Sequence, residues 1–327
     1  MANYKELEGF GVQTLATDPD NTSWVGSIFY NSTEGVFKTV KPGGIAVGTW
    51  ASGGSFPTSA VERMGGAGTQ TAAVSVAGNN PATPTFDGVY EYNGTSWSTN
   101  PNSYPISVFG LWGSGTATAG LFVGGNTPPP SVTGATNKFN GTTFTPTGPL
   151  NTARYYLASS GTENATIASG GTLPPAYALT EDFNGTSWTE VNDLNTPHNQ
   201  HSQTGTATAS LAMGNNPASD IVESWNGISW SSNPTLNTAK QTTSASGTQT
   251  YGLVYAGEFT APLAQTEFWN GTAWTEVADL STARYGGGSL GVSAPADNTV
   301  IWSGNGGSTA TEEWLAPEVV INTLTTS

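Results

Sequence analysis

Short apolar runs that end in glycine recur along the chain and determine its predicted secondary structure. They are rich in small and β-branched residues and are too short for helices. The runs lie at 73–78, 121–124, 167–170, 211–214, 253–257 and 300–304. Runs of this kind are typical of strands that are buried on both faces. The pattern therefore predicts six buried strands, spaced along most of the chain.

A second pattern is a phrase in which Asn-Gly stands between two aromatic residues. It occurs at 92–97, 139–144, 183–188, 225–230 and 269–274. Asn-Gly favours the type I′ turn of a tight β-hairpin, because both residues tolerate a positive φ. Each phrase therefore predicts a hairpin that follows one of the buried strands.

The two patterns combine into one repeat of 42 to 47 residues, measured between the aromatics at 97, 144, 188, 230 and 274. A Gly-Thr turn precedes each of the first five apolar runs and predicts a further hairpin. These turns lie at 68–71, 115–118, 161–164, 205–208 and 247–250. Four short strands in a repeat of this length are typical of a propeller blade. We therefore predict an all-β fold, a six-bladed β-propeller of four-stranded antiparallel blades.

The sixth repeat has a third strand around Trp314 but no aromatic fourth strand after it. The missing strand is present near the start of the chain, at 47–50, where Trp50 precedes Trp97 by one repeat length. We expect this N-terminal strand to complete the last blade, which removes an open sheet edge. The predicted domains are a small β-hairpin appendage at 1–44 with its hairpin at 27–38, a propeller at 45–315 and a C-terminal tail at 316–327, of which 322–327 are expected to be frayed.

Composition excludes several classes of function. The 327 residues include 42 Gly and 11 Trp but no Cys, so disulfides and thiolate metal sites are excluded. A net charge of −15 disfavours nucleic acid as a partner, because phosphates would be repelled. No apolar run is long enough to span a membrane, and 1–8 lack the features of a signal peptide. We expect a soluble protein without membrane insertion or a secretory signal.

The few cations occupy a repeated position. Ten residues after the aromatic of a fourth strand stand Arg154, His198, Lys240 and Arg284, and Arg63 takes the matching place after a longer loop. The second repeat has Ser107 there. One interpretation is a partial ring near the axis that contacts an anion such as an acidic sugar. The other pairs each cation with a third-strand carboxylate, and the repetition favours it. These carboxylates are Glu181, Glu223, Glu267 and Glu312.

The connections between second and third strands are long and rich in proline, and they share one face of the predicted propeller with the cations. They carry the aromatic residues Phe86, Tyr177 and Phe259. Loops on a rigid scaffold commonly bind ligands, so these aromatics and the five cations are the candidate ligand-binding residues. Stiff connection is the alternative role. We expect no metal or other cofactor, because the pair His198 and His201 has no third histidine beside it.

The glycines after the second strand resemble those of kelch-type propellers, with double glycines at 124–125 and 170–171. The Asn-Gly-Thr-Ser-Trp wording, over about residues 45 to 315, resembles degenerate propeller repeats in virion (tail or fibre) proteins of marine tailed bacteriophages. The phrase at 29–37 is similar to one in phage tail-fibre proteins. A hairpin at this place could dock the protein to a particle or simply pack on the propeller.

The resemblance implies a non-enzymatic structural or adhesion protein located in the virion. Its partners would be other virion proteins and a host surface glycan. An enzyme is not expected: a kelch-type copper radical oxidase needs a cysteine, and the repeated boxes of a sialidase are missing. The alternative is a free lectin-like propeller that binds carbohydrate.

Overall fold

The computed structural model describes residues 12–20, 24–43, 47–58, 61–79, 85–128, 131–290, 298–305, 308–316 and 319–324. The fold is all-β, as predicted. The chain divides into two compact units, one formed by Met1–Gly48 with Ala316–Ser327 and the other by Thr49–Leu315. Within the described residues, no helix has the length and hydropathy needed to cross a bilayer.

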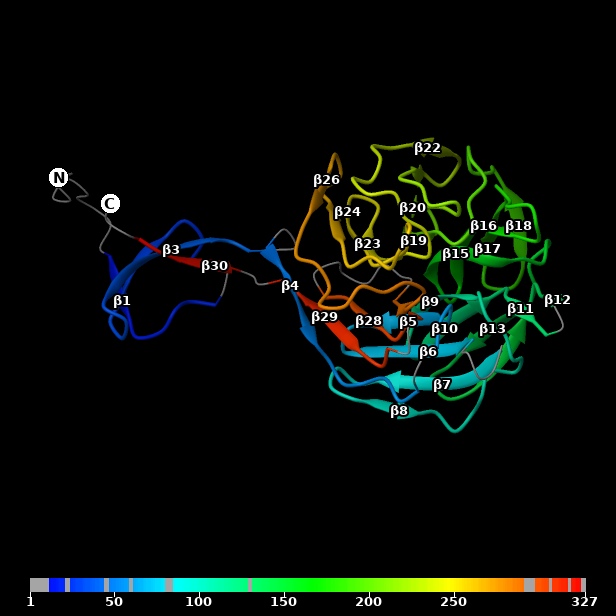
Figure 1. The fold of residues 1–327 in the computed structure, drawn as a ribbon, viewed down its shortest axis with the longest axis horizontal. Coiled ribbons are helices and arrows are strands. Elements are labelled where there is room, and N and C mark those ends of the chain that lie inside the picture. The colour runs from blue at the N-terminus through cyan, green and yellow to red at the C-terminus, as the bar shows by residue number, and fades with distance from the viewer. Residues whose placement is uncertain are drawn as a thin grey trace. The chain divides into compact units, whose positions relative to one another are not determined.

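Six four-stranded antiparallel sheets form the described part of the larger unit (Figure 1). The first two are β5(Gly65–Thr69), β6(Ala72–Gly78), β7(Phe86–Tyr92), β8(Trp97–Thr99), and β9(Trp112–Thr116), β10(Ala119–Val123), β13(Thr136–Phe139), β14(Phe144–Thr147). The third and fourth are β15(Tyr155–Thr162), β16(Ala165–Thr172), β17(Thr180–Phe183), β18(Trp188–Val191), and β19(Ser202–Thr206), β20(Ala209–Met213), β21(Val222–Trp225), β22(Trp230–Ser232). The fifth is β23(Ser244–Thr248), β24(Tyr251–Tyr255), β25(Thr266–Trp269), β26(Trp274–Glu276). A small extra hairpin is formed by β11(Asn126–Thr127) and β12(Ser131–Val132). It lies in a connection that the sequence pattern predicts to be an irregular loop.

The sixth sheet is completed by the N-terminal strand, which confirms that prediction. Its strands are β27(Gly288–Ser289), β28(Val300–Trp302), β29(Thr311–Leu315) and β4(Thr49–Ser52). In the register of β29 and β4, Trp314 lies opposite Trp50, with ring centroids 5.3 Å apart. The strand edge of β29 is therefore covered by backbone from the other end of the unit.

The first strands of the six sheets contact one another in chain order, and β27 contacts β5. Glycine allows this close approach: a Cβ on Gly66 would collide with the carbonyl oxygen of Ser289, and one on Gly113 with that of Gly66. Figure 1 shows these sheets arranged around a common centre. The apolar core lies between neighbouring sheets, as where Leu121 of β10 packs with Phe183 of β17.

Tryptophan side chains of the fourth strands link neighbouring sheets. Trp188 and Trp230 donate their indole N–H to Thr136 and Thr180 of the preceding sheets, each at 3.0 Å. Trp97 and Trp50 donate to Thr311 and Thr266 in the same way, each at 2.9 Å. In β21 Val222 stands in place of the threonine, and Trp274 donates instead to the carbonyl of Pro234. The repeated aromatic therefore makes a polar contact between sheets as well as filling the core.

The Asn-Gly phrases form hairpins, but the predicted type I′ turn is wrong. Gly94 has a φ of +86°, whereas Asn93 is not among the residues with positive φ. Instead the Asn93 side-chain oxygen accepts the backbone N–H groups of Thr95 and Ser96, at 3.0 and 2.9 Å. Such a side-chain cap needs asparagine before the glycine as strictly as a type I′ turn does, which explains why one sequence pattern fits both.

The smaller unit is one sheet of β1(Gln13–Leu15), β2(Ile28–Asn31), β3(Val36–Pro42) and β30(Val319–Thr323), in that order. The hairpin of β2 and β3 confirms the predicted hairpin. The expected fraying of 322–327 is wrong for residues 322 and 323, which belong to β30, because this strand of the tail pairs antiparallel with β3. Residues 319–321 are three consecutive apolar residues, a run too short to predict a strand by itself. Residues 1–11 and 325–327 lie outside the described part.

Candidate functional site

Four of the repeated cations lie inside the sheets and pair with carboxylates of the third strands. Lys240 Nζ lies 3.0 Å from Glu267 Oε1, and His198 Nε2 lies 3.3 Å from Glu223 Oε1. Arg154 donates to Glu181, and Arg284 to Glu312. All four cationic side chains are fully buried. The pairing interpretation is therefore confirmed for these four residues, which are not available to an external anion.

The carboxylates also hold the connection that leads into each first strand. Glu181 accepts the backbone N–H of Asn151 at 2.7 Å, and Glu267 accepts that of Asn237 at 2.6 Å. Burial would raise the pKa of Glu223, but hydrogen bonds from His198 and from Asn195 outweigh it and lower that pKa. Burial lowers the pKa of Lys240, and the adjacent Glu267 opposes the shift. Each pair is thus a structural element of its sheet.

The other two sheets lack this pair, and the assignment of Arg63 to it was wrong. Val61 and Val108 stand in the position of the cation. Tyr90 and Asn137 stand in the position of the carboxylate, two residues before the final aromatic of the third strand. Counting from the fourth-strand aromatic fails here because the connections differ in length. The equivalent of Arg154 in the second sheet is likewise Val108 rather than Ser107.

Arg63 belongs instead to a ring of residues two positions further along each connection. The ring consists of Arg63, Gly110, Tyr156, Gln200, Thr242 and Gly286, all with left-handed φ between 52° and 67°. The backbone N–H of each residue donates to the carbonyl of the preceding one, and Arg63 donates to Gly286, at 2.6 to 3.2 Å. These six hydrogen bonds close a circle at the start of the first strands. Four of the six residues are not glycine, so the closed circle must stabilise an uncommon backbone conformation.

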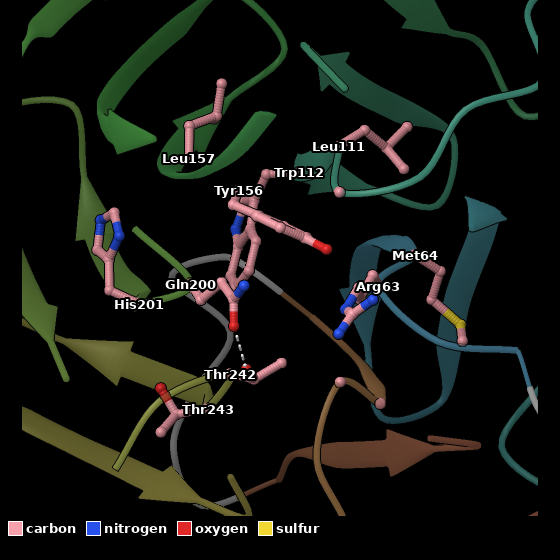
Figure 2. Close-up of a pocket in the computed structure, with 13 residues that line it drawn as sticks. Arg63, Met64, Leu111, Trp112, Tyr156, Leu157, Gln200, His201, Thr242 and Thr243 are labelled. Atoms are coloured by element: carbon pink, nitrogen blue, oxygen red, sulfur yellow. Dashed lines mark hydrogen bonds between the residues drawn. The ribbon is translucent and has the colours of Figure 1, made fainter. Parts of the chain in front are cut away.

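The ring surrounds a cavity of about 40 Å³ (Figure 2). Its walls come from all six sheets, and none of the lining residues is acidic. They are Arg63, Met64, Gly110, Leu111, Trp112, Tyr156, Leu157, Gln200, His201, Thr242, Thr243, Gly286 and Gly287. Arg63, Tyr156, Gln200 and Thr242 are partly exposed, so solvent reaches the cavity from the face where the first strands begin. We call it the axial cavity.

Several polar atoms of the axial cavity have no protein partner among the described residues. Arg63 Nε, Trp112 Nε1 and His201 Nδ1 are buried without a hydrogen bond. Figure 2 shows the Arg63 guanidinium next to the Tyr156 ring, with Trp112 and Gln200 among the residues that line the same cavity. Burial holds the pKa of His201 well below its usual value, and the neighbouring His198 lowers it further, so His201 is neutral at pH 7. Arg63 Nε and Trp112 Nε1 are thus N–H donors of the cavity that need an acceptor.

Aromatic side chains lie beside Arg63. Its guanidinium carbon is 5.4 Å from the centroid of the Tyr156 ring, a cation–π distance. The Tyr156 ring packs 4.5 Å from that of Tyr155, and Phe109 lies 6.0 Å from both. All three aromatic residues are partly exposed. We call Phe109, Tyr155 and Tyr156 the aromatic cluster.

The loop aromatics expected to bind ligand are not brought to the axial cavity. Phe86 begins β7 and stacks on Tyr90 at 6.1 Å, as part of the core. Tyr177 is partly buried, and its backbone N–H donates to Gly171 at 2.8 Å. Phe259 alone of the three is well exposed, at 56%. Gln200 was missed because the ring positions share a backbone conformation and not a residue type. Trp112 lies two residues beyond the ring position Gly110, at the start of β9, where the sheets share no single residue type.

Within the described residues, no group of three His, Asp or Glu side chains is arranged to hold a metal ion. His198 and His201 lie with ring centroids 5.3 Å apart, but His198 is paired with Glu223. No protein-family model matches the chain, and no curated protein is significantly similar to it.

Proposed function

We propose that the unit Thr49–Leu315 is a six-bladed propeller of kelch type that acts as a rigid binding scaffold without catalysis. The observation that carries this proposal is the different use of the cations. Arg154, Lys240 and Arg284 are buried in ion pairs within the sheets and His198 is buried beside Glu223, whereas Arg63 has no ion pair among the described residues and lines the axial cavity. The closed contact of the first strands supports a rigid ring.

We propose further that the protein belongs to a phage virion, where the propeller binds a host glycan or a neighbouring subunit. The repeat wording and the phrase at 29–37 support this assignment. Mass spectrometry of purified phage particles that encode this sequence tests it. Detection at stoichiometric amounts is expected, and consistent absence from the particles would contradict the virion assignment.

The smaller unit would dock the protein to another virion protein. Its sheet buries Phe29 and Lys38 on one face, while Ile28 and Phe37 on the other face are 47% and 49% exposed. Exposed apolar side chains on one sheet face favour a protein contact. Replacing Ile28 and Phe37 by serine should reduce incorporation into particles and leave glycan binding unchanged.

The alternative is a free lectin-like propeller, and the aromatic cluster beside the axial cavity is the observation that favours it. Aromatic rings with a few polar groups are typical of ligand sites. Glycan-array screening together with particle analysis separates the two functions: specific sugar binding by a protein absent from particles would favour the lectin.

A further inference from the structure

We propose that the axial cavity binds a carboxylate group, and that the glycan recognised by the propeller is therefore an acidic one. The first half of this inference stands on the geometry of the cavity alone. The second half rests on the proposed glycan-binding function. The site consists of Arg63, Trp112 and Gln200, with the aromatic cluster at its side.

The donors of the cavity select for an anion. Arg63 Nε and Trp112 Nε1 are buried N–H groups without an acceptor, and neither group can itself accept a hydrogen bond. The Gln200 side-chain oxygen already accepts the Thr242 hydroxyl at 2.9 Å, which leaves its amide N–H groups as donors. A cation in this place would meet the guanidinium and no carboxylate among the lining residues.

The size of the cavity fits a carboxylate. A volume of about 40 Å³ is room for roughly three water-sized atoms, since a single water requires about 10–15 Å³ on this measure. A carboxylate group has three heavy atoms, and its two oxygens match the planar fork of a guanidinium. Because the ring residues are partly exposed, the rest of a larger ligand can remain outside the cavity.

The aromatic cluster provides a place for the remainder of an acidic sugar. Arg63 contacts the Tyr156 ring, so a carboxylate held by Arg63 lies next to the aromatic surface of Phe109, Tyr155 and Tyr156. The apolar C–H face of a sugar ring packs on such a surface. The carboxylate contact at Arg63 and the stacking contact on Tyr156 are thus next to each other in the structure.

The net charge of −15 opposes anion binding, and so does Glu62, which interacts with Arg63 and has Glu258 near it. Burial raises the pKa of Glu62. The positive charge of Arg63 opposes this rise, and the negative charge of Glu258 adds to it. Surface charges beyond about 8 Å are largely screened at physiological ionic strength, whereas direct donors in a partly buried cavity are not. The local donors therefore decide the binding, and the association should strengthen as ionic strength rises from very low values.

The test follows the indole N–H resonance of Trp112 in the full-length ¹⁵N-labelled protein, assigned with Trp112→Phe, during titration with sodium acetate at fixed ionic strength. We expect a saturable shift with a Kd on the order of 1–10 mM, as for a ligand of very few atoms. Arg63→Met should raise this Kd at least tenfold. Lys138→Met removes one positive charge elsewhere in the same unit and should leave it unchanged.

A Trp112 resonance that does not respond to acetate would overturn the carboxylate site. An equal response to chloride would do the same, because it would indicate a site for any small anion. Binding to an array of neutral and carboxylated glycans then separates the two proposals. Acetate binding without any glycan binding would contradict only the proposed function. Glycan binding that is indifferent to the carboxylate and to Arg63→Met would contradict only this inference.

Discussion

Four sheets of the larger unit carry a buried pair of a basic side chain and a glutamate, whereas the sheet β5–β8 and the sheet of β9, β10, β13 and β14 carry none in the described residues. Where Arg154 pairs with Glu181, the equivalent positions of the first sheet are Val61 and Tyr90. Cation and carboxylate are therefore present together or absent together. A single buried charge is costly, while an apolar replacement of both partners is tolerated. The comparison shows that the connection before a first strand can be held with the buried pair, as in four sheets, or without it, as in the other two.

The largest expected effect comes from breaking one pair. Glu181→Gln leaves Arg154 fully buried without a charged partner and should lower the free energy of unfolding by about 3–5 kcal/mol. Chemical denaturation of the purified protein measures it. The double variant Arg154→Val with Glu181→Asn, which copies the second sheet, should lose less than Glu181→Gln alone. The comparison would be contradicted if the double variant lost as much free energy of unfolding as Arg154→Val and Glu181→Asn lose separately, added together.

Removal of the Trp50 side chain tests the sheet that is closed by the chain's N-terminal strand. Trp50 packs against Trp314 and Tyr255 at 5.3 and 5.0 Å, and donates to Thr266. Trp50→Ala should cost about 3 kcal/mol, at the lower end for a tryptophan because Trp50 is only partly buried. Trp24→Ala, in the smaller unit, is the control and should leave the main unfolding transition in place. An unchanged main transition in Trp50→Ala would contradict the closure.

A pH-dependent loss is expected from His201, which only the fourth sheet has at its position. Because burial keeps the folded-state pKa of His201 well below 6.5, the unfolded chain binds the extra proton first as the pH falls. Stability from this residue is therefore complete above about pH 6.5 and decreases by about 1.4 kcal/mol per pH unit below it. Denaturation of the wild type and of His201→Gln between pH 7.5 and pH 5.5 measures the difference. Parallel pH profiles would exclude this role.

A smaller effect is expected from the contacts between sheets. Thr180→Val removes the acceptor of the Trp230 indole and should cost about 1–2 kcal/mol. Val222→Thr is the matched control: it offers Trp274 a hydroxyl, but that indole already donates to Pro234, so less than about 0.5 kcal/mol should be gained. If Val222→Thr gained as much stability as Thr180→Val lost, the threonine hydroxyl alone would explain the loss, and the unpaired indole of Trp230 would not be its cause.

The sequence was a good guide to the strands and to the closing strand, because these depend on local patterns. The apolar runs and the Asn-Gly phrases repeat at a nearly constant spacing, and the missing fourth strand left Trp50 as its replacement. Turn chemistry was less well predicted, since the Asn93 side chain caps the backbone in place of a type I′ turn. The strand β30 was missed because its partner β3 lies at the opposite end of the sequence.

The candidate site was predicted only in part, for a physical reason. The cation–carboxylate pairs repeat in residue type, so spacing reveals them in four repeats. The axial ring repeats in backbone conformation while its side chains range from glycine to arginine, so no motif marks it. Arg63 was found as a candidate but at the wrong position, because Val61 occupies the place that matches Arg154 and Arg63 lies two residues beyond it.

The most direct test of this division among the cations is a side-by-side measurement of the free energy of unfolding for Arg154→Met and Arg63→Met. Arg154 is fully buried in an ion pair, whereas Arg63 is partly exposed, has the Tyr156 ring beside it and makes no ion pair among the described residues. We expect a loss of about 3–5 kcal/mol for Arg154→Met and less than about 1 kcal/mol for Arg63→Met. Equal losses would contradict the claim that Arg63 is the cation left for a ligand.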